Sequence, residues 1–473
     1  MLNRSARLIG VVITAALVTA ACTPGTDPTT TVAPATTTTA SGTTITVETT
    51  TTNPTEPSTD SADLVFFGGP IVTMDPDIGV AEALAVTGDR IVAVGDRADI
   101  EILVDASTEV VDLAGRTLLP GFVDPHSHAL SDAVGFEDDQ QRTLAAGITT
   151  IADGSVEPDL YDEFVTRARS DAIRVRLLMY AAITDPCGVP YDEWWKNLTP
   201  GPITDRLSLA GVKIFSDGSF VCGAVAASEP WAPGATTGPP YQEMSTLRDW
   251  IVAADERSLQ VVVHAQGDLA IERVLDAYES ALEDSDTDLR HRIDHNTFVT
   301  PESAVRYREI GVVPVVFGGS PACTDLEWTD FFKEFGERPN TIIEAAPGTI
   351  VAWHSDDPAW PPDGTIPDLY SLVTRSRLGD DGQPCTPEPW MTTGGVTIDQ
   401  AVQMMTINAA YALGREAEIG SLTPGKLADL IVLSANPLTT PPDDLLDLTV
   451  LTTIVGGVTE HCSPGSESLC PYG

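Results

Sequence analysis

Positive charge is scarce in this chain. Its 473 residues include 26 Lys and Arg against 69 Asp and Glu, which gives a formal net charge of −43. The only lysines are Lys196, Lys213, Lys333 and Lys426. Proteins bind nucleic acids and anionic membranes through clusters of Lys and Arg, so the composition excludes a nucleic-acid partner and attachment through a basic patch. No CxxC spacing occurs among the seven cysteines, so a zinc site built from cysteines is not expected.

The first 59 residues predict export rather than a folded domain. Arg4 and Arg7 precede an apolar run over 8–18 that is too short to span a membrane, as in a signal peptide. The segment 19–22, Thr-Ala-Ala-Cys, resembles a bacterial lipobox. We expect a signal peptide over 1–22, lipidation of Cys22, and a protein anchored at the outer face of the membrane in the cell envelope. An ordinary secretory signal cut near Ala21 is the alternative. Residues 23–59 contain 18 threonines and predict a disordered Thr/Pro-rich linker.

The remaining cysteines are even in number, as expected of an exported protein. They are Cys187, Cys222, Cys323, Cys385, Cys462 and Cys470. An oxidising compartment favours three disulfides, and six cysteines allow fifteen connectivities among which sequence does not choose. Cys462 and Cys470 bracket a short Pro/Gly/Ser segment and form the first pair that we predict. We predict Cys187–Cys222 and Cys323–Cys385 as the other two.

Short β-like runs occupy both ends of the globular chain, and a β/α alternation fills the middle. The runs over 60–120 and 419–473 predict the two parts of one small β-sandwich. Eight apolar strands are expected at 122–128, 149–154, 175–183, 211–217, 260–266, 291–296, 312–317 and 350–356. Helical stretches such as 245–257 and 269–282 separate them. This α/β pattern predicts a TIM (β/α)8 barrel over 121–418, and a doubly wound open sheet is the alternative.

Polar residues recur near the carboxyl ends of these apolar strands. The expected strands carry His126, His128, Lys213, His264, His295 and Asp356. His126 and His128 point to the same face because strand side chains alternate. A lysine inside a buried strand has a lowered pKa and a nucleophilic neutral form. Active sites of TIM barrels lie at this end of the strands, and imidazoles with carboxylates suit zinc or a similar divalent ion.

Several motifs, taken in order, resemble the amidohydrolase superfamily, in particular its YtcJ-like (amidohydrolase 3) branch. They are 119–128 (LPGFVDPHSH), 212–219 (VKIFSDGS), 264–268 (HAQGD), 291–295 (HRIDH), 355–358 (SDDP) and 419–433 (IGSLTPGKLADLIVL). The resemblance covers about residues 62–461.

This resemblance implies two divalent metal ions, most readily zinc, and a water-derived hydroxide that bridges them. His126, His128 and Asp356 would bind one ion, and His264 and His295 the other. Lys213, carboxylated by carbon dioxide, would bridge both. Asp356 would transfer the proton, while His264 and the nearby Asp268 could orient or stabilise the oxyanion.

The implied function is hydrolysis of an amide or another non-peptide C–N bond in a small molecule. Hydrolysis of an ester, lactone or cyclic amide at the same site is one alternative. A non-catalytic surface lipoprotein with the same fold is another. A homo-oligomer is compatible with either function, and the substrate is left open because specificity resides in the βα loops.

The sequence departs from the family pattern at two places. Only 18 residues separate His128 from Gly147, which predicts a reduced lid over the site. The usual Gly-Ser-Asp of the eighth strand is His354-Ser355-Asp356, and His354 could support a ligand, approach substrate or fill space. We expect His291 and His461 to be structural. The loop tryptophans Trp194, Trp195, Trp231, Trp328 and Trp360 fit either a substrate pocket or local packing.

Overall fold

The computed structural model describes residues 61–472 apart from 132–134, 219–223, 284, 325, 358–363 and 380. The predicted signal peptide with Cys22, the predicted linker and Cys222 lie outside the described residues. Residues 59–473 belong to one compact unit. Among the described residues, no helix combines the length and the apolar character needed to cross a membrane.

Eight parallel strands follow one another around a barrel. They are β6 (Phe122–Ser127), β7 (Ile148–Val156), β8 (Arg176–Ala182), β10 (Leu207–Phe215), β11 (Gln260–Ala265), β12 (Arg292–His295), β13 (Val313–Phe317) and β14 (Ala352–His354). The short β9 (Gly201–Thr204) pairs antiparallel with β10. The order is β6-β7-β8-β10-β11-β12-β13-β14, and every neighbouring pair is parallel.

Backbone bonds beyond β14 join the last strand to the first. The His128 N–H donates to the Asp357 carbonyl at 2.8 Å, and the Asp356 N–H donates to the His126 carbonyl at 3.2 Å. The eight-stranded sheet is therefore nearly closed on itself. The predicted TIM barrel and its eight strands are confirmed, and the open doubly wound sheet is excluded.

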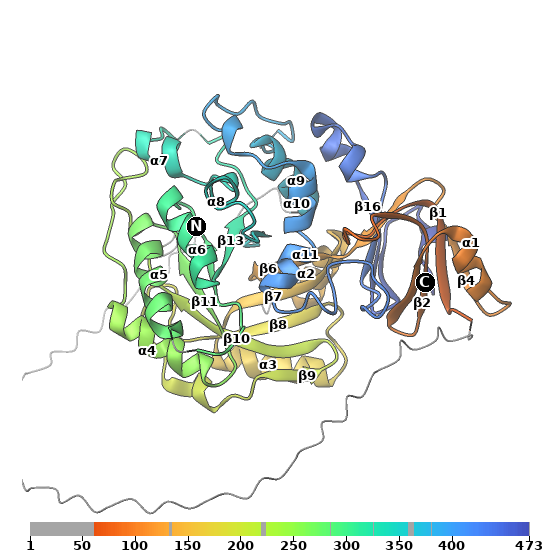
Figure 1. The fold of residues 1–473 in the computed structure, drawn as a ribbon, viewed down its shortest axis with the longest axis horizontal. Helices are drawn as coiled ribbons and strands as arrows, with labels where there is room; N and C mark the ends of the chain where they lie inside the picture. The colour runs from red at the N-terminus through yellow and green to blue at the C-terminus, as the bar shows by residue number, and fades with distance from the viewer. Residues whose placement is uncertain are drawn as a thin grey trace, which may run out of the picture. The chain divides into compact units, whose positions relative to one another are not determined.

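Helices cover the outside of the barrel (Figure 1). They are α2 (Phe136–Ala145), α3 (Pro158–Arg169), α4 (Met244–Asp255), α5 (Asp268–Leu282), α6 (Pro301–Ile310), α7 (Asp330–Phe335), α8 (Asn340–Ala345), α9 (Thr365–Thr374), α10 (Ile398–Met404) and α11 (Ile407–Ala412). Short 3-10 turns are η2 (Glu193–Asn197) and η3 (Thr392–Gly394). Helix α5 buries Ile271, Val274, Leu275 and Tyr278, which are spaced to form one face of a helix. It therefore packs this apolar face inward.

The two ends of the globular chain build one small sheet domain. Its strands are β1 (Leu64–Val72), β2 (Val80–Thr87), β3 (Arg90–Gly95), β4 (Glu109–Asp112), β5 (Thr117–Pro120), β15 (Leu430–Leu433), β16 (Val450–Val455) and β17 (Val458–Cys462). Its short helical turns are α1 (Arg97–Ile100), η1 (Glu101–Leu103) and η6 (Glu467–Leu469). The turns η4 (Pro437–Thr439) and η5 (Pro442–Asp447) connect β15 to β16 and pack on α10 and α9 of the barrel. The two ends meet where β5 pairs antiparallel with β15.

Strand β1 gives this sheet its two layers. A register shift between Phe67 and Ile71 interrupts the pairing of β1 with β2. The first half of β1 pairs with β4, whereas Ile71 pairs with β5. One apolar core holds residues from both ends of the chain, including Phe66, Leu84 and Val432. The small β-sandwich predicted from the two ends is thereby confirmed.

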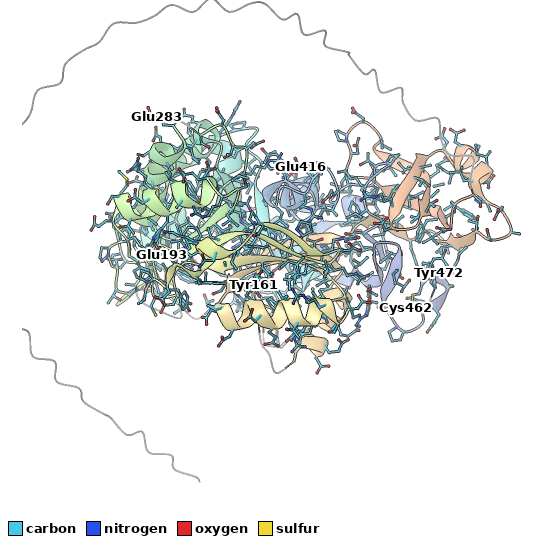
Figure 2. All side chains as sticks on the ribbon, turned by 90° about the horizontal axis from the view of Figure 1, so that it is seen from below. Tyr161, Glu193, Glu283, Glu416, Cys462 and Tyr472 are labelled. Carbon is cyan, nitrogen blue, oxygen red and sulfur yellow. A yellow bond between two sulfur atoms is a disulfide. The ribbon has the colours of Figure 1, made fainter. Side chains whose placement is uncertain are left out.

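Disulfides join two of the predicted cysteine pairs. Cys323–Cys385 and Cys462–Cys470 have Cα–Cα distances of 5.7 and 5.9 Å. Both pairings are confirmed, and Figure 2 shows Cys462 and Tyr472 on the small sheet domain. Cys187 is also disulfide-bonded, but its predicted partner Cys222 is not among the described residues.

Candidate metal centre

The predicted donor residues come from five different strand ends and meet in one place. Parallel pairing sets Phe215 of β10 opposite His264 of β11, and Ala265 opposite His295 of β12. Lys213 and His126 are fully buried, and His264 is 2% exposed. His295 and Asp356 have φ values of 78° and 55°, in the left-handed region that non-glycine residues seldom occupy. Such backbone strain is common where a side chain must be aimed at a functional site.

His126, His128 and Asp356 form one compact group of donors. The Nε2 atoms of the two histidines are 3.3 Å apart. The Asp356 Oδ1 atom lies 3.3 Å from Nε2 of His126 and 3.8 Å from Nε2 of His128. One donor atom from each residue fits within 4.8 Å of the others, which is compact enough to hold a metal ion. The structure thus brings together the three residues predicted for one ion.

Lys213 lies directly beside this group. Its Nζ atom is 3.2 Å from Nδ1 and 3.4 Å from Nε2 of His126, and 4.0 Å from Oδ2 of Asp294. Burial lowers the pKa of Lys213 to about 8, although the carboxylates of Asp294 and Asp356 oppose this shift. Near pH 7 roughly a tenth of the amine is therefore neutral and carries a free lone pair, a far larger share than in an exposed lysine.

His264 and His295 complete the predicted donor set. Their ring centroids are 4.2 Å apart, and the His295 ring lies 4.8 Å from the His126 ring. Burial lowers the pKa of each of these three histidines well below the usual value, and the charge of Lys213 adds to the effect. The imidazoles are therefore neutral, the form in which histidine binds metals.

The polar atoms of this cluster fit divalent metal ions. Both ring nitrogens of His264 and Nε2 of His295 make no hydrogen bond to any residue that the structure describes. His264 Nε2 lies 3.4 Å from Oδ1 of Asp217, without hydrogen-bond geometry. Leaving a buried polar atom unpaired costs about 1–3 kcal/mol, and most such atoms in proteins have a partner. Nitrogen and carboxylate donors arranged in this way suit zinc.

Asp294 was not predicted as part of the site, yet it orients the first histidine. His126 Nδ1 lies 2.6 Å from Oδ2 of Asp294, and Arg292 Nε lies 3.1 Å from Oδ1 of the same carboxylate. Donation from Nδ1 leaves the Nε2 lone pair of His126 free to bind a metal. Arg292 and Asp294 alternate along a buried strand. That pattern was a visible signal that the sequence analysis did not use.

Two further aspartates support the site. Asp153 accepts a hydrogen bond from Ser131, and its Oδ1 atom lies 4.0 Å from Nδ1 of His128. Asp217 accepts backbone N–H groups of Ala226, Gln266 and Gly267 at 2.8–3.0 Å, which ties the ends of β10 and β11 to the following loops.

Asp268, considered with His264 for the oxyanion, instead bonds the backbone of the loop before α4. Its Oδ1 atom accepts the Ser228 N–H at 2.8 Å. This contact braces the chain at the start of α5.

The three remaining histidines have different surroundings. His291 and His461 bond to other protein groups, whereas His354 lies among the donor residues. His291 Nδ1 accepts the Val261 N–H at 2.9 Å, and its Nε2 atom lies 3.1 Å from Asp255. His461 contacts Gln141 and Ser463. His291 and His461 are therefore structural, as expected. His354 instead lies within the metal-centre cluster, with its ring 4.9 Å from that of His126 and 4.7 Å from that of His295.

A cavity of about 380 Å³ opens beside the cluster. Gln266, Thr297, Phe317, Ser355 and Asp357 line it next to the donor residues. Its apolar wall includes Trp231, Trp328, Phe298 and Phe332, and the Trp328 and Phe332 rings stack at 3.9 Å.

The loop tryptophans therefore have different positions. Trp231 and Trp328 line the cavity. Trp195 is buried in the barrel core, and Trp194 contacts Tyr161, which is labelled in Figure 2. Trp360 lies outside the described residues.

Comparisons with known proteins agree with this arrangement. The chain is 26% identical over 423 residues to "Protein LONG AFTER FAR-RED 3" of Arabidopsis thaliana, covering 82% of this chain and 68% of that protein. It is 29% identical over 267 residues to the N-substituted formamide deformylase of Arthrobacter pascens, covering 54% of this chain and 46% of that enzyme. The chain thus spans about half the length of the deformylase. A solved structure of an uncharacterized metal-dependent hydrolase from Pyrococcus horikoshii OT3 has the same fold, with a TM-score of 0.67 at 18% identity over 80% of this chain and 99% of that one.

The family assignment rests on the barrel from β7 onward and on β15 and β16 of the small sheet domain. The sequence model of the family described as "Amidohydrolase family" matches residues 133–460, which is more than half of the chain. The matched region contains the ends of β10, β11 and β12 with Lys213, His264 and His295. The chain belongs to the amidohydrolase family.

Proposed function

We propose that this protein is a metal-dependent hydrolase that cleaves an amide or another non-peptide C–N bond of a small molecule. The observation that carries the proposal is the convergence of unpaired neutral histidines, Lys213 and Asp356 at one end of the barrel. The expected ligands are His126, His128, Lys213, His264, His295 and Asp356. Two divalent ions, most readily zinc, would activate water and polarise the substrate carbonyl when bound.

Asp356 transfers the proton from the attacking water to the leaving nitrogen in this proposed mechanism. Burial raises the pKa of Asp356 to about 7, although the charge of Lys213 opposes this shift. A carboxylate beside the attacking water can accept its proton and return it to the leaving group. Asp356 takes the proton of the attacking water as oxygen bonds to the carbonyl carbon. It then delivers that proton to the leaving nitrogen as the C–N bond breaks.

The surrounding carboxylates hold the imidazoles in the required form. Asp294 fixes His126 with Nε2 free, and Asp153 lies on the Nδ1 side of His128. His264, 3.4 Å from Asp217, is placed beside the donor cluster, where it could stabilise developing negative charge on the substrate.

We further propose that Lys213 carries a carbamate. The neutral amine attacks carbon dioxide, an N–C bond forms, and one proton leaves to give an anion. The buried position beside His126 and the lowered pKa of Lys213 support this step. Reconstitution of metal-free protein in bicarbonate-depleted buffer should then recover less activity than reconstitution with bicarbonate, whereas equal recovery contradicts the carbamate.

The cavity and the relatives support the substrate class. The aromatic wall favours a substrate with an apolar group next to the cleaved bond. The relative from Arthrobacter pascens is an N-substituted formamide deformylase, which acts on a C–N bond. A purely binding function does not account for the retention of every predicted donor in one cluster.

A substrate screen tests the proposed activity. Zinc-loaded protein is assayed against N-acyl amines, N-substituted formamides, cyclic amides and matched esters, with Asp356→Asn as the inactive control. Release of amine by the parent protein but not by the variant supports the proposal. Ester cleavage without any amide cleavage replaces it with the ester alternative.

Export with a lipid anchor on Cys22 is proposed separately. The disulfides Cys323–Cys385 and Cys462–Cys470 support an oxidising compartment. Cys22→Ala should move the protein from the membrane fraction to the soluble fraction, and Thr23→Ala serves as the matched control. Membrane retention of the Cys22 variant contradicts the anchor.

A further inference from the structure

We propose that His354 is an additional metal ligand, so that His295, His354 and Asp356 together hold one of the two ions. The inference rests on the metal dependence proposed above, and it adds a ligand that the family resemblance does not include. The sequence left three roles open for His354, namely supporting a ligand, approaching the substrate or filling space. Direct metal binding takes the place of all three.

The geometry places His354 in a second compact donor group. One donor atom each from His295, His354 and Asp356 fits within 4.8 Å of the others, as in the group of His126, His128 and Asp356. Asp356 belongs to both groups. Its carboxylate has two oxygens and can therefore serve two ions at once. The two groups share this one residue and therefore lie next to each other.

The ring nitrogens of His354 have no other use among the described residues. Both Nδ1 and Nε2 are buried without a hydrogen-bond partner, and the side chain is fully buried. The ring stacks on His126 with an interplanar angle of 28° and lies 5.6 Å from Phe317. Stacking alone leaves both nitrogens unsatisfied, and an apolar ring of similar size would avoid that cost.

His291 shows what a structural histidine looks like in the same barrel. It is 3% exposed, yet Nδ1 accepts the Val261 N–H and Nε2 contacts Asp255. His291 and His354 are therefore almost equally buried. Both ring nitrogens of His291 have a partner, whereas neither ring nitrogen of His354 has one among the described residues. The difference points to a partner for His354 that lies outside the described residues, and a metal ion held with His295 and Asp356 would supply it.

The position in the chain explains why His354 reaches the ion. It is the last residue of β14, two residues before Asp356. Its ring lies 4.7 Å from that of His295, and one of its donor atoms falls within 4.8 Å of donor atoms of His295 and Asp356. The family pattern has glycine here, and glycine offers no donor. The histidine is thus a difference at the centre of the site rather than at its rim.

Metal binding by His354 variants tests the inference without relying on activity. His354→Gln removes the ring and keeps a polar side chain, and His354→Gly restores the residue usual in the family. His461→Gln is the control, because His461 belongs to neither donor group and its ring bonds Gln141 and Ser463. Metal content per chain is measured after dialysis against a series of chelator concentrations. Melting temperature is measured with and without zinc.

We expect the parent protein and His461→Gln to retain two ions. Each folded His354 variant should bind one ion at least about 10–100-fold more weakly, with a smaller zinc-induced rise in melting temperature. Two ions held with parent affinity in either folded variant overturn the inference. The same holds if the variants lose stability only in the metal-free form, because that result shows a packing role.

A measurement on the parent protein covers the case in which neither variant folds. In ¹⁵N-histidine-labelled protein, zinc should change the ring-nitrogen shifts of five histidines, including His354. Unchanged ring shifts for His354 overturn the inference even when the other four respond. A parent protein that binds no metal at all instead contradicts the proposed function.

Discussion

The two ends of the barrel both bury charged side chains but treat them differently. At the amino end of β8, Arg176 pairs with Asp429 through Nε–Oδ2 at 2.7 Å and Nη2–Oδ1 at 2.9 Å. The Gly456 N–H also donates to Asp429 at 2.8 Å. This pair joins the barrel to the small sheet domain, and Asp429 has protein partners on both oxygens.

At the carboxyl ends of the strands, the buried polar atoms are incompletely paired. Both ring nitrogens of His264 and of His354 lack a hydrogen-bond partner among the described residues. The comparison teaches that buried charge alone does not mark a functional site. A cluster of several unsatisfied imidazole nitrogens beside a carboxylate marks it, because a ligand can then supply the missing partners.

The largest expected effect is on catalysis at the unsatisfied end. Asp356→Asn keeps the shape of the side chain but cannot carry the proton, so kcat should fall about a thousandfold. The circular dichroism and melting temperature of the metal-free variant should stay close to those of the metal-free parent protein. A kcat within a few-fold of the parent value removes Asp356 from the role of proton carrier.

An Asp-to-Asn substitution in the Arg176–Asp429 pair should lower stability and leave kcat almost unchanged, the reverse of what is expected for Asp356→Asn. Asp429→Asn breaks a buried ion pair and should lower the free energy of unfolding by about 3–5 kcal/mol, measured by denaturant titration. The kcat of the folded protein should be nearly unchanged. If Asp429→Asn is as stable as the parent protein and loses activity instead, the distinction between the two ends fails.

A smaller effect is expected at the aromatic wall of the cavity. Trp328→Ala should raise KM about tenfold for substrates with an apolar ring while leaving kcat nearly unchanged, because the wall binds a group away from the cleaved bond. Trp194→Ala, which alters a tryptophan packed on Tyr161 outside the cavity, is the control. An equal rise in KM in both variants means that the wall does not contact substrate.

The smallest expected effect is on stability, at the hydrogen bond between His291 and Asp255. The hydrogen bond from His291 lowers the pKa of Asp255 to about 2. A lowered folded-state pKa contributes stability above the unfolded value near 4, and that contribution is lost as pH falls toward 2. Asp255→Asn should therefore cost about 1 kcal/mol at pH 7 and progressively less between pH 4 and pH 2. Parallel stability curves across that range for the two proteins contradict this account.

The sequence predicted the barrel well because its strands are buried on both faces. A lysine or histidine within an apolar run is conspicuous there, so Lys213 and His264 could be identified from their own neighbours. The two-residue spacing of His126 and His128 added a shared face. These signals are local, and the register of parallel strands then brings them together.

Other features depend on partners that are distant in the sequence. Arg176 and Asp429 are separated by 253 residues, and no local pattern connects them. Asp294 orients His126 from 168 residues away. His354 was visible as a departure, but its role depends on the unpaired state of its nitrogens. Only the three-dimensional structure reveals that state.

Titration of metal-free parent protein with zinc tests the central claim most directly. Metal content, melting temperature and amidase activity are followed against the number of equivalents added. The account predicts that two ions bind per chain and that activity reaches its plateau with the second. Retention of fewer than one ion per chain, with melting temperature unaffected by zinc, would contradict it.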